Sequence, residues 1–430
     1  MLEILAIIFL GIFLLVAKRN IVWALGLLIL LLPTYLWRLD FFGLPSTFLE
    51  LMIIGVFIFW LLERKRWKKL NWQFLVTNHK LANPWRWFLL AWLVISLVGL
   101  LVNPTWAALG LWRAYFLQPL LFILVFLYSV KTKQDRQVIL YGLGALVLWL
   151  ALFAIWQSFT AWNLPAAYNE PNVKRLTAVF AYPNALSLLI APITACFTGL
   201  WLSSKNKSKE LAYLGVIFLG VLLLISTKSE GALLALGLCL LFYFFFSKIN
   251  KNRKLFFALI LVLAIFLSPA KDYLVQAGQD LVSPDPNQYT SSLAVRGLQW
   301  QETIDLLNDH WLLGAGIDGY QKMMANYHQI TWLEIFLYPH NLFLNFWVEL
   351  GLLGLVLIIT LLIYLATVCR QLIKSKHYLA WGVTLAWLTW FVHGLVDVPY
   401  FKNDLSLLFF ILLGLTMLAV HDNKSNLRLL

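Results

Sequence analysis

Long apolar segments alternate with short polar segments along most of the chain. Each apolar segment holds roughly 16–25 residues, a helical length that suits a hydrocarbon layer about 30 Å thick. The pattern predicts an all-α protein, a polytopic transmembrane helical bundle of about 12–13 spans. We place the spans at residues 2–17, 20–36, 46–63, 86–102, 111–130, 137–159, 181–202, 210–226, 231–247, 254–270, 342–366, 378–396 and 404–420.

The composition supports the membrane class. Of the 430 residues, 61% are hydrophobic and 12% are charged, and the mean hydropathy is +0.79, which is more apolar surface than a soluble domain needs. The three cysteines lie within or at the end of apolar segments, so the sequence indicates neither a disulfide framework nor a zinc site. The first apolar segment lacks the basic beginning of a signal peptide, and we expect it to be the first span.

Basic residues cluster in every second predicted loop, which is the positive-inside pattern of a cytoplasmic face. Topology therefore explains the net charge of +13, and we expect no nucleic-acid partner. The clusters also suit contact with anionic lipid in the bilayer. They lie at residues 18–19, 63–69, 131–136, 204–209, 247–254 and 370–376, and in the tail with Lys424 and Arg428.

The opposite, extracytoplasmic face carries one large loop at residues 271–341. It separates N-terminal transmembrane helices (1–270) from C-terminal transmembrane helices (342–430) within a single integral membrane domain. Residues 295–320 of this loop combine a broken apolar pattern with tryptophans, which predicts short amphipathic helices at the membrane interface.

A polar stripe follows the loop in the segment YPHNLFLNFWVELGLLG at residues 338–354. Asn341, Asn345 and Glu349 recur every four residues and share one helical face, and His340 stands at its outer end. One interpretation is a capping asparagine, interhelical hydrogen bonds and an interfacial histidine. The other is an outward vestibule in which an acid, a histidine and two amides orient a hydroxyl and transfer its proton.

Four cations on the outer side are candidates for binding an anionic ligand. Lys174 and Arg175 precede the helix that starts near Asn184, and an arginine fork suits a diphosphate. Anchoring at the membrane surface explains the same pair. Lys228 and Glu230 interrupt the apolar segments in STKSEGALLALG, where a tight outward turn is the alternative to a ligand site.

The fourth cation, Arg296, belongs to a loop with eight acidic residues and only two other basic residues, Lys271 and Lys322. An arginine in such surroundings is more often dedicated to a specific contact. The chain contains no GxxxxGK loop, no HExxH pair and no Asp-x-Asp pair, so no nucleotide cofactor and no metal site is indicated.

The chain resembles the superfamily of O-antigen ligases and O-antigen polymerases, which are bacterial membrane glycosyltransferases. The resemblance covers about residues 110–365. Four features carry it in order, namely RLTAVFAYPNALSLL, STKSEGALLAL, RGLQWQETIDLLNDHWLLGAGIDGY and PHNLFLNFWVELGLLGLV. Each motif is weak alone, and together they indicate the superfamily rather than one reaction.

The resemblance implies a donor glycan on undecaprenyl diphosphate at the outer face of the cytoplasmic membrane. An acceptor hydroxyl, on a glycolipid, a glycan or a protein, displaces the lipid diphosphate without a metal or other cofactor. By position Arg296 and His340 would be catalytic, and Asn341 and Glu349 would support them.

Arg175, Arg296 and Lys228 would bind the diphosphate, with Asn345, Asn184 and Glu230 as further supporting or acceptor residues. The family usually has Ser-Arg-Gly-Ala-Leu-Leu where this chain has Glu230 before the glycine and Lys228 two positions earlier. Lysine does not replace arginine in a bidentate phosphate contact. If Lys228 supplies the cation, a kinked turn must present it.

Several functions stay open at this point. A ligase moves the glycan to another acceptor, a polymerase joins lipid-linked repeat units, and other transferases of the superfamily are conceivable. A transporter would carry charged or broken helices at mid-membrane in two corresponding halves, and no such pair is visible. Loss of all surface glycan in a deletion strain favours a ligase, whereas attachment of single repeats favours a polymerase.

Overall fold

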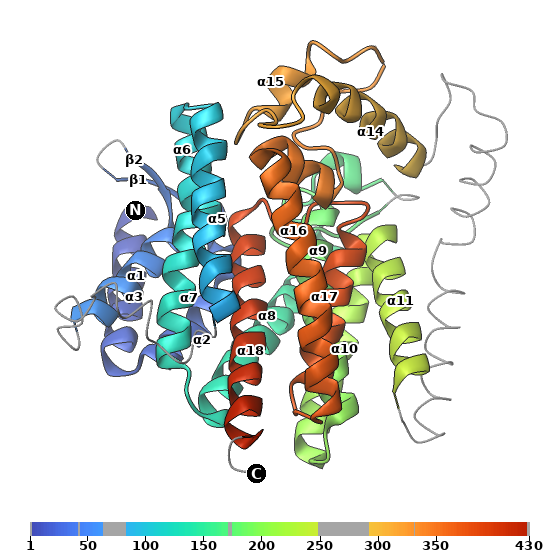
Figure 1. Ribbon diagram of the computed structural model, residues 1–430. Helices are drawn as coiled ribbons and strands as arrows, with labels where there is room; N and C mark the ends of the chain where they lie inside the picture. The colour runs from blue at the N-terminus through green and yellow to red at the C-terminus, as the bar shows by residue number, and fades with distance from the viewer. Residues whose placement is uncertain are drawn as a thin grey trace.

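The computed structural model describes residues 2–41, 44–62, 83–170, 174–247, 292–330 and 332–427, and this part of the chain is almost entirely helical (Figure 1). The predicted all-α polytopic fold is confirmed. The elements are α1 (Leu2–Arg19), α2 (Ile21–Leu30), η1 (Leu32–Leu36), β1 (Arg38–Phe41), β2 (Leu44–Thr47), α3 (Phe48–Leu62), α5 (Asn83–Val102), α6 (Trp106–Trp112), η3 (Arg113–Leu117), α7 (Gln118–Ser129), α8 (Lys133–Thr160), η4 (Ala166–Tyr168), α9 (Pro183–Ser203), α10 (Lys207–Thr227), α11 (Glu230–Phe246), α14 (Ser292–Asp309), α15 (Tyr320–Met324), α16 (Leu342–Lys374), α17 (Ala380–His393) and α18 (Asn403–Leu427).

Every predicted span except 254–270 coincides with helical structure. That span, residues 271–291 of the outer loop and the basic residues 63–69 and 248–254 lie outside the described residues. Within the described ranges, seven helices are long and apolar enough to cross a membrane, and α2, α3 and α11 are shorter apolar helices.

The first correction concerns residues 20–47, where an uninterrupted helix and a plain loop were expected. The helix α2 ends at Leu30, and the short 3₁₀ helix η1 begins at Leu32 with Pro33 as its second residue, because proline lacks the N–H that an α-helix interior needs. The strands β1 and β2 follow as an antiparallel hairpin, in which Arg38 pairs with Thr47. The stacked rings of Trp37 and Phe48 close its base, and this tertiary contact leaves no periodic signal in the sequence.

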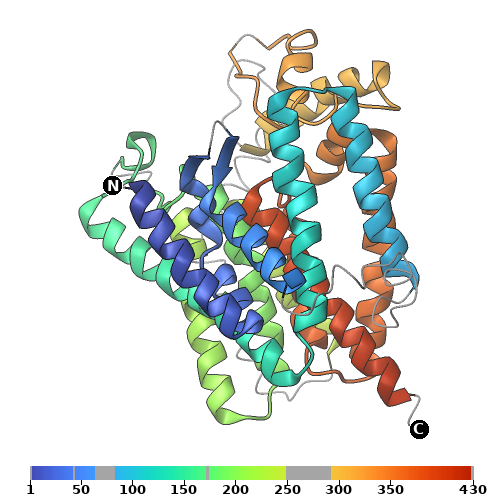
Figure 2. The same cartoon turned by 90° about the vertical axis from the view of Figure 1, so that its left-hand side faces the viewer.

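Helix α9 forms the centre of the bundle, because its apolar segment is buried on all sides. It packs against α10, α11 and α17. A methyl group added at Gly199 of α9 would lie 2.3 Å from the backbone of Trp381, so glycine allows these two helices to approach closely. The two views in Figure 1 and Figure 2 place α14 and α15 above one end of this bundle.

Helix α16 contains a break at Gly351, whose φ of 70° is the left-handed region that glycine tolerates. The loop before α15 inserts at the break. The Leu352 N–H donates to the Leu312 carbonyl at 3.0 Å, and the Ala315 N–H donates to the Val348 carbonyl at 2.7 Å. The backbone groups freed by the break are thus paired, and the outer loop is fixed to the membrane-spanning part.

The same loop is held by α5. The Ile317 N–H donates to the Gly99 carbonyl at 3.1 Å, and the Asn103 side chain donates to the Ile317 carbonyl at 2.8 Å. Helix α14, which the sequence predicted as an amphipathic helix, buries Leu306 and Leu307 against this assembly. The predicted short helices of the outer loop are therefore confirmed for the part that the structure describes.

Candidate functional site

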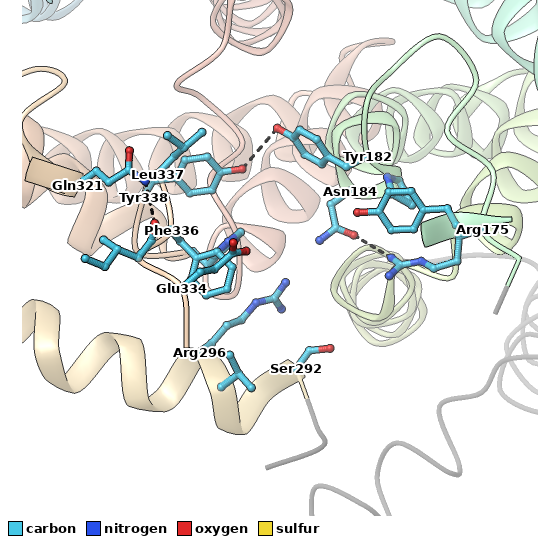
Figure 3. Close-up of a pocket in the computed structure, with 15 residues that line it drawn as sticks. Arg175, Tyr182, Asn184, Ser292, Arg296, Gln321, Glu334, Phe336, Leu337 and Tyr338 are labelled. Atoms are coloured by element: carbon cyan, nitrogen blue, oxygen red, sulfur yellow. Dashed lines mark hydrogen bonds between the residues drawn. The ribbon is translucent and has the colours of Figure 1, made fainter. Parts of the chain in front are cut away.

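A pocket of about 700 Å³ lies between the outer loop and the start of α9 (Figure 3). Four of the outer-face residues that the sequence singled out line it, namely Arg175, Asn184, Arg296 and His340. Its lining residues are Tyr168, Arg175, Tyr182, Pro183, Asn184, Ser292, Val295, Arg296, Gln321, Glu334, Ile335, Phe336, Leu337, Tyr338 and His340.

Asp397, in the connection between α17 and α18, joins the polar groups of this pocket. Its carboxylate lies 3.2 Å from Nδ1 of His340 and 3.8 Å from Nη2 of Arg296, and it accepts a hydrogen bond from the Asn184 amide at 3.3 Å. The residue is 1% exposed. The sequence analysis missed Asp397, although a single acid inside the apolar segment LVDVPYF was an available signal.

Asp397 is ionised in the folded protein. Burial alone would raise the pKa of its carboxyl, but the hydrogen bond from His340 and the charges of His340 and Arg296 outweigh burial and hold the pKa at about 2. An ionised carboxylate can only accept hydrogen bonds, so Nδ1 of His340 carries the proton. In the neutral imidazole the lone pair is then on Nε2, for which no hydrogen bond is found among the described residues.

His340 has an uncommon backbone conformation, with a φ of 45°. Hydrogen bonds on both sides of His340 hold this conformation. From α14, the Gln299 side chain donates to the Tyr338 carbonyl and the Trp300 indole donates to the Pro339 carbonyl, both at 2.8 Å. On the other side, Asn341 caps α16 by accepting from the next N–H groups. These contacts compensate the backbone strain and fix the direction of the imidazole.

Arg175 occupies the side of the pocket nearest α9. It donates to the side-chain amide oxygen of Asn184 at 3.1 Å and to the Thr227 backbone carbonyl at 2.8 Å. Burial lowers the pKa of its guanidinium, and the ring of Tyr168 lies 6.0 Å below it. Asn184 therefore links Arg175 to Asp397, so that the two pocket arginines, the histidine and the acid form one connected group.

Lys228 is placed differently from Arg175 and Arg296. It stands in a kinked turn, as a left-handed residue with φ 47° at the end of α10, but it does not line the pocket. Glu230, at the start of α11, interacts electrostatically with Arg296 and Arg175. The structure therefore brings Arg175, Arg296, Asn184 and His340 together and leaves Lys228 outside this group.

The polar stripe of α16 lies beneath the outer loop, and its members do not line the pocket. Asn341 is a helix cap that also donates to the Leu395 carbonyl at 2.9 Å. Asn345 is 1% exposed, and its amide atoms have no partner among the described residues. Glu349 accepts from the Asp318 N–H at 3.0 Å and so holds the outer loop.

Within the ranges that the structure describes, no group of three His, Cys, Asp or Glu side chains could hold a metal ion. The pocket offers two guanidinium groups, an imidazole–carboxylate pair, the separate carboxylate of Glu334, amides and phenols. Such a set binds a polyanion and moves a proton.

The fold and this pocket define a polytopic helical membrane protein with a cationic site that contains a histidine–aspartate pair. Residues 214–359 match the family model described as O-antigen ligase, and this match supports assignment of the chain to the O-antigen ligase superfamily. The match agrees with the resemblance found in the sequence and contains three of its four motifs, whereas RLTAVFAYPNALSLL lies outside it. A search of curated proteins found no match.

Only part of the candidate site lies within the matched residues. The match includes Arg296 and His340, whereas Arg175, Asn184 and Asp397 lie outside residues 214–359. The family match supports a glycosyltransferase-type enzyme whose general function is that of an O-antigen ligase or polymerase.

Proposed function

We propose that this protein is an O-antigen ligase-like glycosyltransferase. It moves a glycan from undecaprenyl diphosphate to an acceptor hydroxyl at the outer face of the cytoplasmic membrane. The observation that carries the proposal is the convergence of His340, Asp397, Arg296 and Arg175 on one pocket. The acceptor would be a glycolipid, a glycan or a protein, and the reaction would need no metal or other cofactor.

In the proposed reaction, the acceptor oxygen attacks the anomeric carbon of the donor sugar. The bond between that carbon and the phosphate oxygen breaks, and its electron pair leaves with undecaprenyl diphosphate. The acceptor proton passes to Nε2 of His340. Asp397 stabilises the resulting imidazolium through Nδ1, and proton transfer of this kind contributes roughly 10²- to 10⁴-fold to a rate.

Arg296 and Arg175 would stabilise the leaving diphosphate, on which negative charge grows as the bond breaks. Charge stabilisation of this kind is usually the largest single contribution to catalysis. Arg175 is already oriented by Asn184 and Thr227, so little reorganisation is needed when the phosphate binds. When the diphosphate binds, Arg296 would leave its 3.8 Å contact with Asp397 and contact a phosphate oxygen instead. Its own charge would not change.

The arrangement of the helix ends supports the proposed orientation in the membrane. Helices α9 and α16 begin beside the pocket, and α10 ends beside it, so the turns at residues 204–206 and 375–379 lie at the opposite end of the bundle. These turns adjoin the basic clusters at 204–209 and 370–376. With the basic end cytoplasmic, the pocket and the large loop are extracytoplasmic.

A polymerase that joins lipid-linked repeat units is the alternative, because the chemistry at the anomeric carbon is the same. The two differ in the acceptor. The length of the transferred glycan in a defined reaction therefore separates them.

The test uses the full protein in nanodiscs with an undecaprenyl-diphosphate glycan and a panel of acceptors, without metal or nucleotide sugar. Release of undecaprenyl diphosphate is measured. We expect release by the wild type and losses of at least a hundredfold for His340→Ala and Arg296→Ala. His310→Ala and Lys322→Ala, which change exposed residues of the same outer loop, are the matched controls. Near-normal release by folded His340→Ala or Arg296→Ala protein contradicts the proposal.

A further inference from the structure

The pocket has two chemically different sides, which Figure 3 shows apart. Arg175, with Asn184 beside it, occupies one side. Gln321, Glu334 and Phe336 occupy the other, and Arg296 lies between the two sides in this view. The proposed reaction uses only the first side. The second side carries the carboxylate of Glu334, which would repel a polyanion.

The size of the pocket agrees with two subsites. A volume of about 700 Å³ is within the range of pockets that enclose a whole organic ligand. A diphosphate group fills only a small part of it. The remaining space is lined by aromatic, aliphatic, amide and carboxylate groups rather than by cations, which suits an uncharged occupant with hydroxyl groups and apolar faces.

The charges also set the direction in which a lipid-linked donor enters. Glu334 repels a phosphate oxygen, and Arg175 and Arg296 attract one. A carboxylate accepts hydrogen bonds from sugar hydroxyls and is a good partner for them. The diphosphate therefore lies toward the arginines, and the part of the donor beyond the anomeric carbon lies toward Glu334.

Phe336 supplies a flat apolar surface next to His340, the proposed base. Its side chain is half-buried, and its ring centroid lies 5.2 Å from that of His340 in an edge-to-face contact. The faces of an aromatic ring carry partial negative charge and attract the weakly positive C–H groups on the face of a pyranose. A sugar stacked on Phe336 would therefore lie close to the proposed base, His340.

Hydrogen bonds within the outer loop hold the side of the pocket that carries Gln321, Glu334 and Phe336. The Gln321 side-chain N–H donates to the Ile335 carbonyl at 2.8 Å, which leaves its carbonyl oxygen to accept from a ligand. In the same loop, Nδ1 of His328 lies 3.0 Å from the Glu302 carboxylate, and Nε2 of His328 lies 2.7 Å from the Leu333 carbonyl oxygen. The segment that carries Glu334 and Phe336 is therefore held at the carbonyl groups of Leu333 and Ile335.

We infer that Gln321, Glu334 and Phe336 form a carbohydrate subsite for the first sugar of the lipid-linked donor, on the opposite side of the pocket from the diphosphate subsite. This inference rests on the proposed function and adds the place and chemistry of sugar recognition to it.

The experiment compares binding of two kinds of ligand to the full protein in nanodiscs. One is undecaprenyl diphosphate without sugar, and the other is a panel of undecaprenyl-diphosphate-linked N-acetylglucosamine, galactose and rhamnose. The variants are Phe336→Leu, which keeps apolar bulk without a ring, Phe336→Trp, which keeps a ring, and Glu334→Gln. Trp332→Leu is the matched control, because Trp332 is an exposed ring of the same segment that does not line the pocket.

We expect at least one sugar-bearing ligand to bind the wild type more tightly than the bare lipid diphosphate. Phe336→Leu should weaken that binding by about five- to tenfold and leave binding of the bare lipid diphosphate unchanged. Phe336→Trp and Trp332→Leu should stay within about twofold of the wild type, and Glu334→Gln should weaken only the sugar-bearing ligand.

Two failures are distinguishable. If the wild type binds the bare lipid diphosphate but no panel member more tightly, or if Phe336→Leu weakens both ligands equally, the carbohydrate subsite is wrong and the proposed function stands. If folded wild type binds neither kind of ligand, the proposed function itself fails, and the subsite fails with it.

Discussion

Replacement of Asp397 by asparagine tests the centre of the proposed site. The side chain keeps its shape but loses its negative charge. His340 then loses the partner that stabilises its protonated form, and Arg296 loses a counter-charge at 3.8 Å. We expect the catalytic rate constant to fall by about a thousandfold, because an imidazole without its carboxylate is a weaker and less well-oriented base.

The effect on stability follows from the pKa of Asp397. Its value is about 2 in the folded protein, against 3.8 for an unperturbed aspartate. One pKa unit corresponds to about 1.4 kcal/mol, so the ionised carboxylate stabilises the folded state by on the order of 2 kcal/mol. Because the folded pKa is lowered, this stabilisation is complete above about pH 4 and disappears as the pH falls through 2.

The assay has two readouts on the same nanodisc preparations. Release of undecaprenyl diphosphate reports catalysis, and thermal unfolding at pH 7 and pH 3 reports stability. Asp397→Asn should unfold at a lower temperature than the wild type at pH 7, and the difference should narrow at pH 3. Asp305→Asn, an exposed aspartate on α14, is the control. A rate within twofold of the wild type, or a stability difference that is independent of pH, refutes the reasoning.

Three further predictions concern the loop insertion and the cations. Gly351→Ala should lower the free energy of unfolding by at least about 2 kcal/mol, because a left-handed alanine is strained and its methyl would lie 2.3 Å from the Leu312 carbonyl oxygen. Gly215→Ala, whose methyl meets no atom within 4 Å and which lies inside α10, should not lower the unfolding temperature in the same measurement. Arg175→Lys should lower donor turnover by about ten- to a hundredfold despite its retained charge, because the fork to Asn184 and Thr227 is lost; wild-type turnover would show that charge alone suffices. Lys228→Ala should change the Michaelis constant for the donor by less than about threefold, since Lys228 does not line the pocket; a tenfold increase would instead assign it to the diphosphate.

Much of the candidate site could be predicted from the sequence, because the motifs that carry Arg296 and His340 are short and local. The stripe of α16 was also recognisable, since residues four apart share a helical face. Which neighbour that face meets was not predictable. Asn345 and Glu349 lie beneath the outer loop because Gly351 breaks the helix there, and a backbone angle at one glycine has no periodic signature.

The sequence by itself determined that this chain is a bundle of membrane helices, and it indicated which loops share a face. Those properties depend on segment length, apolar content and the distribution of charge, which are summed over many neighbouring residues. Only the tertiary structure decided that Asp397, 57 positions after His340, contacts His340 at the candidate site, and that Lys228 does not line its pocket. Contacts between residues so far apart depend on how the helices pack around α9, and packing is a property of the whole bundle rather than of any local segment.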